Sequence, residues 1–206
     1  MGSGCGQNQF SKQMNKNRLE AFSDGVLAII ITIMVLELRP PASTSFLSLR
    51  PLIPKILSYV MSFAFIGIYW NNHHHLLHTV KKVNGGILWA NLNLLFWLSL
   101  IPFTTAWMGE HGFAGPPVAL YGIVLLMAGV AYYVLVRFIL YRHGRDSVLA
   151  RAIGSDFKGK ISLGIYAIGI LCAFFLPFLA QVLYALVALM WLIPDTRIER
   201  ILEKEE

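Results

Sequence analysis

The sequence predicts an all-α membrane protein with six transmembrane helices per subunit. Three observations support this prediction: the apolar composition, the division of the apolar residues into blocks, and the placement of the basic residues. Of the 206 residues, 56% are hydrophobic and 14% are charged, whereas soluble domains contain about 25% charged residues. The mean hydropathy is +0.61. Such a composition is typical of an integral membrane protein.

The apolar residues occur in blocks that are separated by short polar or Gly- and Pro-rich stretches. These blocks lie near residues 26–38, 52–70, 86–107, 117–141, 161–176 and 178–193. A helix that crosses the hydrocarbon core needs about 20 residues, so we interpret the blocks as six spans. The fifth and sixth blocks run together over residues 172–181, where Pro177 is expected to separate two helices.

Basic residues lie beside the ends of the blocks, as Lys and Arg do in cytoplasmic loops. The clusters comprise Lys12, Lys16 and Arg18; Lys81 and Lys82; Arg137, Arg142, Arg145, Arg151, Lys158 and Lys160; and Arg197, Arg200 and Lys204. With six spans these four clusters fall on one side of the membrane, which places both termini in the cytoplasm. Arg39, Arg50 and Lys55 form the exception, because they lie in the loop between the first and second spans.

The chain is predicted to form one membrane domain with two polar ends. Residues 1–17 are expected to be a flexible cytoplasmic tail, residues 18–195 the six-helix transmembrane domain, and residues 196–206 a charged cytoplasmic tail. Residues 47–51 are expected to lie at the membrane interface. The net charge of +6 follows from the positive-inside pattern. Nucleic acid is therefore not an expected partner.

The first block contains polar residues inside a segment that is otherwise apolar enough to enter a bilayer. At about 100° per residue, Ile29, Thr32, Ile33 and Leu36 fall on one helical face and extend over about 10 Å of the axis. Copies of this face around a symmetry axis would form apolar rings with one hydroxyl layer, and such rings can gate ion flow by dewetting. The same stripe also fits ordinary helix packing. Periodicity alone leaves both interpretations open.

An acidic residue within a membrane helix normally has a function or a partner. Asp24 lies about 140° around the helix from Ile29, so we expect it to point into the protein. The second block ends in a run of Trp, Asn and His over residues 70–78, at the depth of Asp24. We therefore predict a network of Ser, Asp, His and Asn side chains between the two helix ends, with a structural or gating role.

Two other functional classes also fit parts of the sequence. His74 and His78 have the i, i+4 spacing of half a zinc site, but the sequence lacks His-Glu-x-x-His and has no carboxylate close to them. A metal-binding membrane enzyme that uses the cluster from His73 to His78 is thus one alternative. A proton-permeable protein or proton-linked transporter is the other, because histidine titrates near neutral pH. No Thr-Val-Gly-Tyr-Gly filter or row of spaced Arg residues is present.

Two motifs resemble the transmembrane protein 175 family. The run Arg18-x-x-x-Phe22-Ser23-Asp24-Gly25-Val26-x-Ala28-Ile29-x-x-Thr32-x-x-x-Leu36-Glu37 resembles the signature of its first helix, and Trp70-x-x-His73-His74 resembles the pattern of its second. The resemblance covers the chain from Arg18 to the C-terminus. It implies a prokaryotic single-repeat, potassium-selective, leak-type cation channel. The implied assembly is a homotetramer in the cell (inner/plasma) membrane, in which the first helices line a central pore without a re-entrant pore loop.

The resemblance also implies roles for individual residues. The pore constriction falls on Ile29, Ile33 and Leu36, and the polar pore layer on Thr32. The structural or gating network falls on Arg18, Phe22, Ser23, Asp24, Gly25, Trp70, His73 and His74. Implied partners are membrane lipids and monovalent cations, with potassium as the permeant ion. No enzymatic activity, metal or cofactor is expected. His75 and His78 depart from the family's usual pattern.

Overall fold

The computed structural model describes residues 4–80, 83–143 and 157–192, with side chains for residues 16–80, 83–141 and 157–192. Every regular element in these ranges is a helix, which confirms the predicted all-α class. The elements are α1 (Gly4–Leu36), the 3-10 helix η1 (Phe46–Leu52), α2 (Ile53–His78), α3 (Gly85–Ser99), α4 (Ile101–Glu110), α5 (Gly115–His143), α7 (Phe157–Ala173) and α8 (Pro177–Leu192).

Four segments of the described chain are long and apolar enough to cross a membrane. They are Lys16–Leu36, Phe46–His78, Gly85–Glu110 and Gly115–Tyr141. In the fifth and sixth predicted spans, α7 has 17 residues and α8 has 16. The predicted separation of these two helices is confirmed, because α8 begins at Pro177 after a break at residues 174–176.

The third predicted span consists of two consecutive helices. Leu100 joins the end of α3 to the start of α4, and Pro102 lies in the first turn of α4. Proline has no amide hydrogen, so it cannot continue the backbone hydrogen bonds of the preceding helix. At the other end, Asn84 caps α3 by accepting a hydrogen bond from the amide of Ile87 at 2.9 Å.

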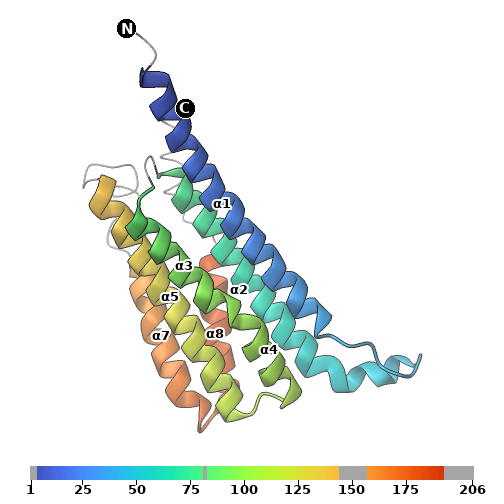
Figure 1. Ribbon diagram of the computed structural model, residues 1–206. Helices are drawn as coiled ribbons and strands as arrows, with labels where there is room; N and C mark the ends of the chain where they lie inside the picture. Colours follow the sequence, from blue (N-terminus) through green and yellow to red (C-terminus); the bar gives the residue numbers. More distant parts are fainter. Residues whose placement is uncertain (1–3, 81–82, 144–156, 193–206) are drawn as a thin grey trace.

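The helices pack side by side in one bundle (Figure 1). Helix α1 contacts α2, α3 and α4, whereas α5 contacts α3, α4, α7 and α8. The first turns of α1 extend beyond the other helices (Figure 1). The helix begins at Gly4, within the segment 1–17 that we expected to be a tail. No Gly or Pro occurs between Gly6 and Gly25 to interrupt it. The predicted tail at residues 196–206 lies outside the described residues.

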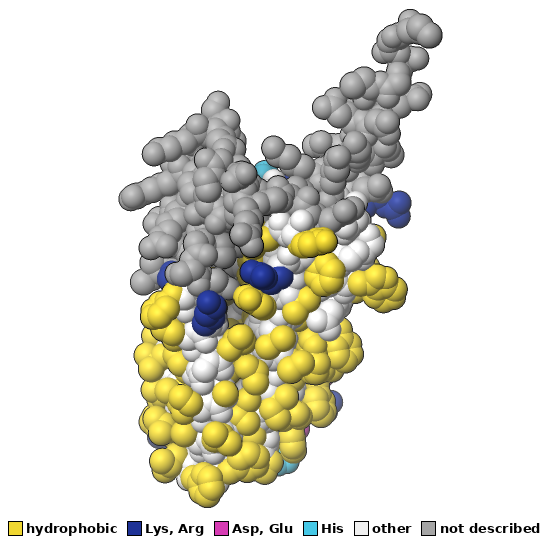
Figure 2. Space-filling model, turned by 90° about the vertical axis from the view of Figure 1, so that its left-hand side faces the viewer, with side chains coloured by type: hydrophobic (Ala, Val, Ile, Leu, Met, Phe, Trp, Pro, Cys, Tyr) yellow, Lys and Arg dark blue, Asp and Glu magenta, His cyan; other side chains and the backbone are white. Residues whose placement is uncertain are grey.

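The outer surface of the bundle is largely apolar. Figure 2 shows hydrophobic side chains over most of the described part of one face, with Lys and Arg side chains towards one end. Exposed large apolar residues on α5 and α7 include Ile123, Phe138, Ile168 and Leu171. Contiguous exposed apolar surface of this kind marks an interaction with a membrane or a partner. It agrees with the candidate spans identified by helix length.

Tyr184 of α8 fills the centre of the packing between α5, α7 and α8. It is fully buried, and its ring centroid lies 6.1 Å from those of Tyr121 and Tyr166. Two glycines make room for it. A Cβ atom added at Gly169 would lie 2.5 Å from Cε1 of Tyr184, and one added at Gly122 would collide with the Tyr184 hydroxyl. The bundle therefore depends on the absence of side chains at these two positions.

Replacing Gly122 with Ala is expected to destabilise the protein by about 1–3 kcal/mol, the usual cost of overpacking a core. The apparent melting temperature in detergent should fall by several degrees. Gly67→Ala is the matched control, because a Cβ atom there would meet no atom within 4 Å. Equal melting temperatures for the two variants would contradict the packing described for Tyr184.

Candidate functional site

Helix α1 has one buried side and one exposed side in the single chain. Leu19, Ser23, Leu27, Ile30 and Met34 are buried, at the three- and four-residue spacing of one helical face. This face packs against α2, α3 and α4. Residues on the other side of the helix, such as Ile29 and Leu36, are exposed in the single chain.

The four residues predicted to line a pore all lie on the exposed side of α1. The exposed fractions are 58% for Ile29, 43% for Ile33 and 76% for Leu36, and Thr32 is also exposed. The Thr32 hydroxyl donates a hydrogen bond of 2.8 Å to the carbonyl oxygen of Ile29. Because a hydroxyl oxygen also carries acceptor lone pairs, Thr32 retains the capacity to accept a bond or contact a cation.

A buried chain of hydrogen bonds joins α1, α3 and α2. The Asn91 side-chain amide donates to Ser23 Oγ at 2.9 Å, and Ser23 Oγ donates to the carbonyl oxygen of Leu19 at 2.8 Å. The Asn91 Oδ1 atom lies 2.7 Å from His73 Nε2. Since Oδ1 can only accept, His73 must carry a proton on Nε2. Ser23, Asn91 and His73 are all buried, so the chain fixes the relative position of the three helices.

Asp24 belongs to a second and separate contact. The indole Nε1 of Trp70 donates to Asp24 Oδ1 at 3.1 Å, and both residues are exposed. The expectation that Asp24 points into the protein was therefore wrong for the single chain. Its neighbour Ser23, about 100° away around the helix, occupies the buried position. The rotation of α1 against α2 and α3 decides which of the two is enclosed.

The histidines near the end of α2 also differ in burial. His73 is buried, whereas His74 is exposed and its ring stacks on Trp70 with centroids 6.1 Å apart. His74 also contacts the ring of His78, with centroids 5.0 Å apart. In the described part of the chain, no histidine is hydrogen-bonded to Asp24. No group of three or more His, Cys, Asp or Glu residues there could hold a metal ion.

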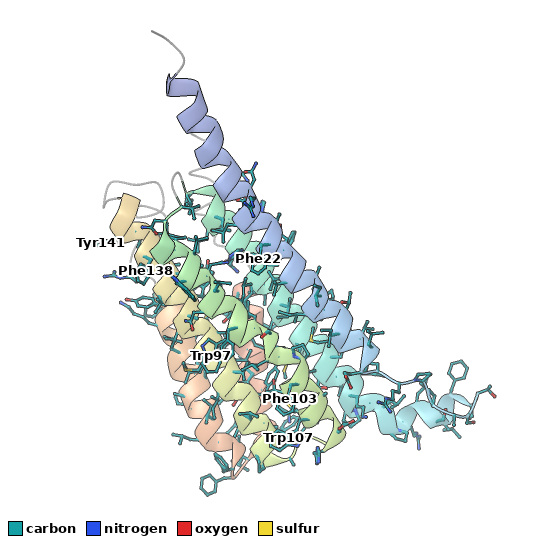
Figure 3. The ribbon with its side chains drawn as sticks, in the orientation of Figure 1. Phe22, Trp97, Phe103, Trp107, Phe138 and Tyr141 are labelled. Atoms are coloured by element: carbon teal, nitrogen blue, oxygen red, sulfur yellow. The ribbon has the colours of Figure 1, made fainter. Side chains whose placement is uncertain are left out.

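The remaining predicted network residues lie on the exposed side of α1. Phe22, which is labelled in Figure 3, is 54% exposed. A Cβ atom added at Gly25 would meet nothing within 4 Å. Arg18 is exposed, and no hydrogen bond or ion pair within the described residues joins it to Ser23 or Asp24. In the single chain these three residues are thus available to a neighbouring molecule.

The contacts of two residues in this region, Asn91 and Lys16, were not predicted from the sequence. Asn91 is a polar residue within the third apolar block, and that position was a usable signal, because polar side chains inside spans commonly bond to other helices. Lys16 donates to the carbonyl oxygen of His78 at 3.2 Å, at the end of α2. A cation there complements the negative end of the helix dipole. The spacing of residues in the sequence does not indicate that Lys16 bonds to the carbonyl oxygen of His78.

Comparisons with known proteins identify the family to which the sequence is related. The family model for the endosomal/lysosomal potassium channel TMEM175 matches residues 18–102. A potassium channel of Chryseobacterium sp. (strain P1-3) is 59% identical over 191 residues, which cover 93% of this chain and 100% of that protein. The endosomal/lysosomal proton channel TMEM175 of Danio rerio is 25% identical over 202 residues, covering 89% of this chain and 37% of that protein.

The structural comparison agrees with the sequence relationship. The crystal structure of a lysosomal potassium-selective channel TMEM175 homolog from Chamaesiphon minutus matches with a TM-score of 0.77 and 26% sequence identity. The match covers 88% of this chain and 98% of that chain. The resemblance seen in the two sequence motifs is thereby confirmed, and the chain belongs to the TMEM175 family.

Proposed function

We propose that this chain forms a potassium-selective, leak-type cation channel, as a homotetramer in the prokaryotic cell membrane. The observation that carries the proposal is its 59% identity to a bacterial potassium channel over the whole length of that protein. Because this family and these relatives are channels, we assign no enzymatic activity. The chain would be a multi-pass membrane protein with α7 and α8 as its fifth and sixth spans and both termini in the cytoplasm.

The exposed side of α1 supports the position of the pore. Ile29, Ile33 and Leu36 extend outward from a helix whose opposite face is packed into the bundle. A single copy cannot enclose a pathway with one helix, so copies must surround a common axis. The three residues would then form stacked apolar rings, and Thr32 would form a hydroxyl layer between them. No re-entrant loop is needed in this arrangement.

The rings would act on the hydration of the ion. A narrow apolar ring opposes water and ions together, so the closed pathway is dry and the open one requires partial loss of the hydration shell. Sodium holds its water more strongly than potassium, and the barrier for sodium is therefore higher. Oxygen atoms at Thr32 would replace some of the lost water. The Ser23–Asn91–His73 chain would hold α1 at the rotation that directs these residues to the axis.

Reconstitution tests the proposal directly. Purified full-length protein in liposomes should pass potassium down its gradient, and sodium more slowly, and its mass in detergent should correspond to four copies. Liposomes without protein are the control. Absence of potassium flux from a folded tetramer would refute the channel assignment. A monomer that conducts would refute the pore built from α1.

Thr32→Val is expected to lower the preference for potassium over sodium by a factor of about two to five, because the change removes an oxygen and keeps the side-chain shape. The flux ratio of the two ions in liposomes measures this. Thr104→Val is the matched control, since Thr104 is buried and bonds to backbone carbonyls of its own helix. A Thr32 variant with the wild-type ratio would exclude a selectivity role for this hydroxyl.

Proton permeation is a second candidate function, favoured by the relative from Danio rerio, which is named a proton channel. Acidification of liposomes that contain a pH-sensitive dye would detect it. Proton flux without potassium flux would replace the main proposal. Flux that saturates with a co-substrate would instead indicate a proton-linked transporter. Stoichiometric metal in the purified protein would favour the metal-binding alternative at residues 73–78.

A further inference from the structure

The short helix η1 lies where the chain enters the membrane. Residues 71–78 of α2 carry Asn and His side chains, which suit the opposite membrane boundary. The remaining residues 53–70 rise about 27 Å at 1.5 Å per residue, close to the thickness of about 30 Å of the hydrocarbon core. Helix η1 precedes residue 53 directly and therefore falls at the boundary itself. It turns away from the axis of α2 and extends to the side of the bundle (Figure 1).

The apolar side chains at the start of η1 are strongly exposed in the described chain. Phe46 is 90% exposed, Leu47 is 67% exposed, and no residue of η1 is buried. Large apolar side chains at such exposure are unfavourable in water. A position at the membrane boundary removes this cost, because the outer acyl region lies within reach of the side chains.

Serine side chains hold η1 in shape. Ser45 accepts a hydrogen bond from the amide of Leu47 at 3.3 Å. Ser48 Oγ is 2.6 Å from the carbonyl oxygen of Ser45 and 3.0 Å from that of Ser43, and its hydroxyl donates to them. These local bonds satisfy backbone groups that the bilayer core would leave unpaired. The apolar side chains are thus presented from an ordered element.

The same segment carries the basic residues that depart from the positive-inside pattern. No Asp or Glu occurs from Leu38 to Lys55. Lys55 forms an ion pair of 3.0 Å with Glu110. Arg39 and Arg50 are exposed, and neither forms an ion pair within the described residues. A guanidinium group beside exposed apolar side chains complements the phosphate groups of lipids.

We propose that η1 is an interfacial anchor that binds the bilayer surface. Phe46 and Leu47 insert below the headgroups, and Arg50 binds the phosphate of anionic lipids. The anchor fixes the depth of the end of α1 and the start of α2 relative to the membrane. It also explains why basic residues are present in this loop. The inference requires that the chain spans a membrane and does not depend on ion conduction.

Site-directed spin labelling tests the anchor. In a background with Cys5→Ser and Cys172→Ala, Phe46→Cys carries a nitroxide in the reconstituted full-length protein, and Thr44→Cys is the control two residues earlier. At position 46 the label should collide more with oxygen than with a water-soluble nickel complex, and at position 44 the reverse. Equal access of the nickel complex to both positions would overturn the proposal. Shielding of position 46 from both reagents would also overturn it, because η1 would then pack on a second copy.

The phosphate contact is tested in the same labelled protein. Adding phosphatidylglycerol to phosphatidylcholine vesicles should increase the ratio of oxygen to nickel collisions at position 46 by about twofold, and high salt should reverse the increase. Arg50→Gln should abolish the increase. Arg137→Gln, on the described part of α5, is the control and should preserve it. An increase that persists in Arg50→Gln would refute the role of Arg50.

Discussion

Replacing Ile29 with Asn is expected to increase potassium flux through the reconstituted protein by about tenfold, which corresponds to a barrier lower by about 1.4 kcal/mol. Asn is similar in length to Ile but binds water, so a ring of Asn side chains would fill with water where a ring of Ile side chains excludes it. Sodium should benefit more than potassium, because the pathway would no longer strip water from the ion. Flux of both ions in liposomes measures the two effects.

Two variants control this experiment. Ile29→Val keeps the ring apolar and removes one methylene group, so its flux should stay within about twofold of wild type. Val35→Asn places the same polar group on an exposed position of α1 that lies about 120° from Ile29 around the helix. Its flux should not increase. If Ile29→Asn leaves both conductance and selectivity unchanged, Ile29 does not form the constriction.

Among the polar residues in the described part of the bundle, Asn91 is expected to be the one whose replacement by an apolar residue, Leu, destabilises the protein most. Leu has the same branching and the same number of side-chain heavy atoms as Asn, but it cannot accept from His73 or donate to Ser23. The buried His73 Nε2–H would then lack a partner, at a cost of about 2–3 kcal/mol. The apparent melting temperature in detergent should fall by roughly 5–10 °C. Thermal unfolding followed by tryptophan fluorescence checks the result.

Asn93→Leu is the matched control, because Asn93 lies on the same helix but is exposed. Its melting temperature should remain close to that of wild type. Adding His73→Phe to Asn91→Leu should cost less than the sum of the single changes, since the unpaired histidine is removed. Additive losses would show that Asn91 and His73 do not act as a pair.

The helical class and the places of the helices could be predicted from the sequence. Apolar blocks of about 20 residues admit few structures other than membrane helices, and Pro177 ends one helix and begins another. The division of the third span was not predicted, although Pro102 marks it. Whether Pro102 bends, ends or merely starts a helix depends on the backbone around Leu100, which composition does not specify.

The candidate site was predictable in part. The spacing of Ile29, Ile33 and Leu36 already placed them on one face, and the structure leaves that face exposed in the single chain. The polar contacts were less predictable. Asp24 was expected to be enclosed, but Ser23 is. A rotation of α1 by about 100° would exchange the two, and such a rotation is set by packing against α2 and α3.

The sequence by itself determined the all-α class, which residues of the first span share a face, and which family the chain resembles, because these depend on apolar composition, on local periodicity and on motifs within single helices. The tertiary structure alone decided that Asn91 of α3 connects Ser23 to His73, and that Trp70 takes Asp24 as its acceptor. These contacts join residues 18 to 68 positions apart in the chain. Only the packing of whole helices brings such residues within hydrogen-bonding distance.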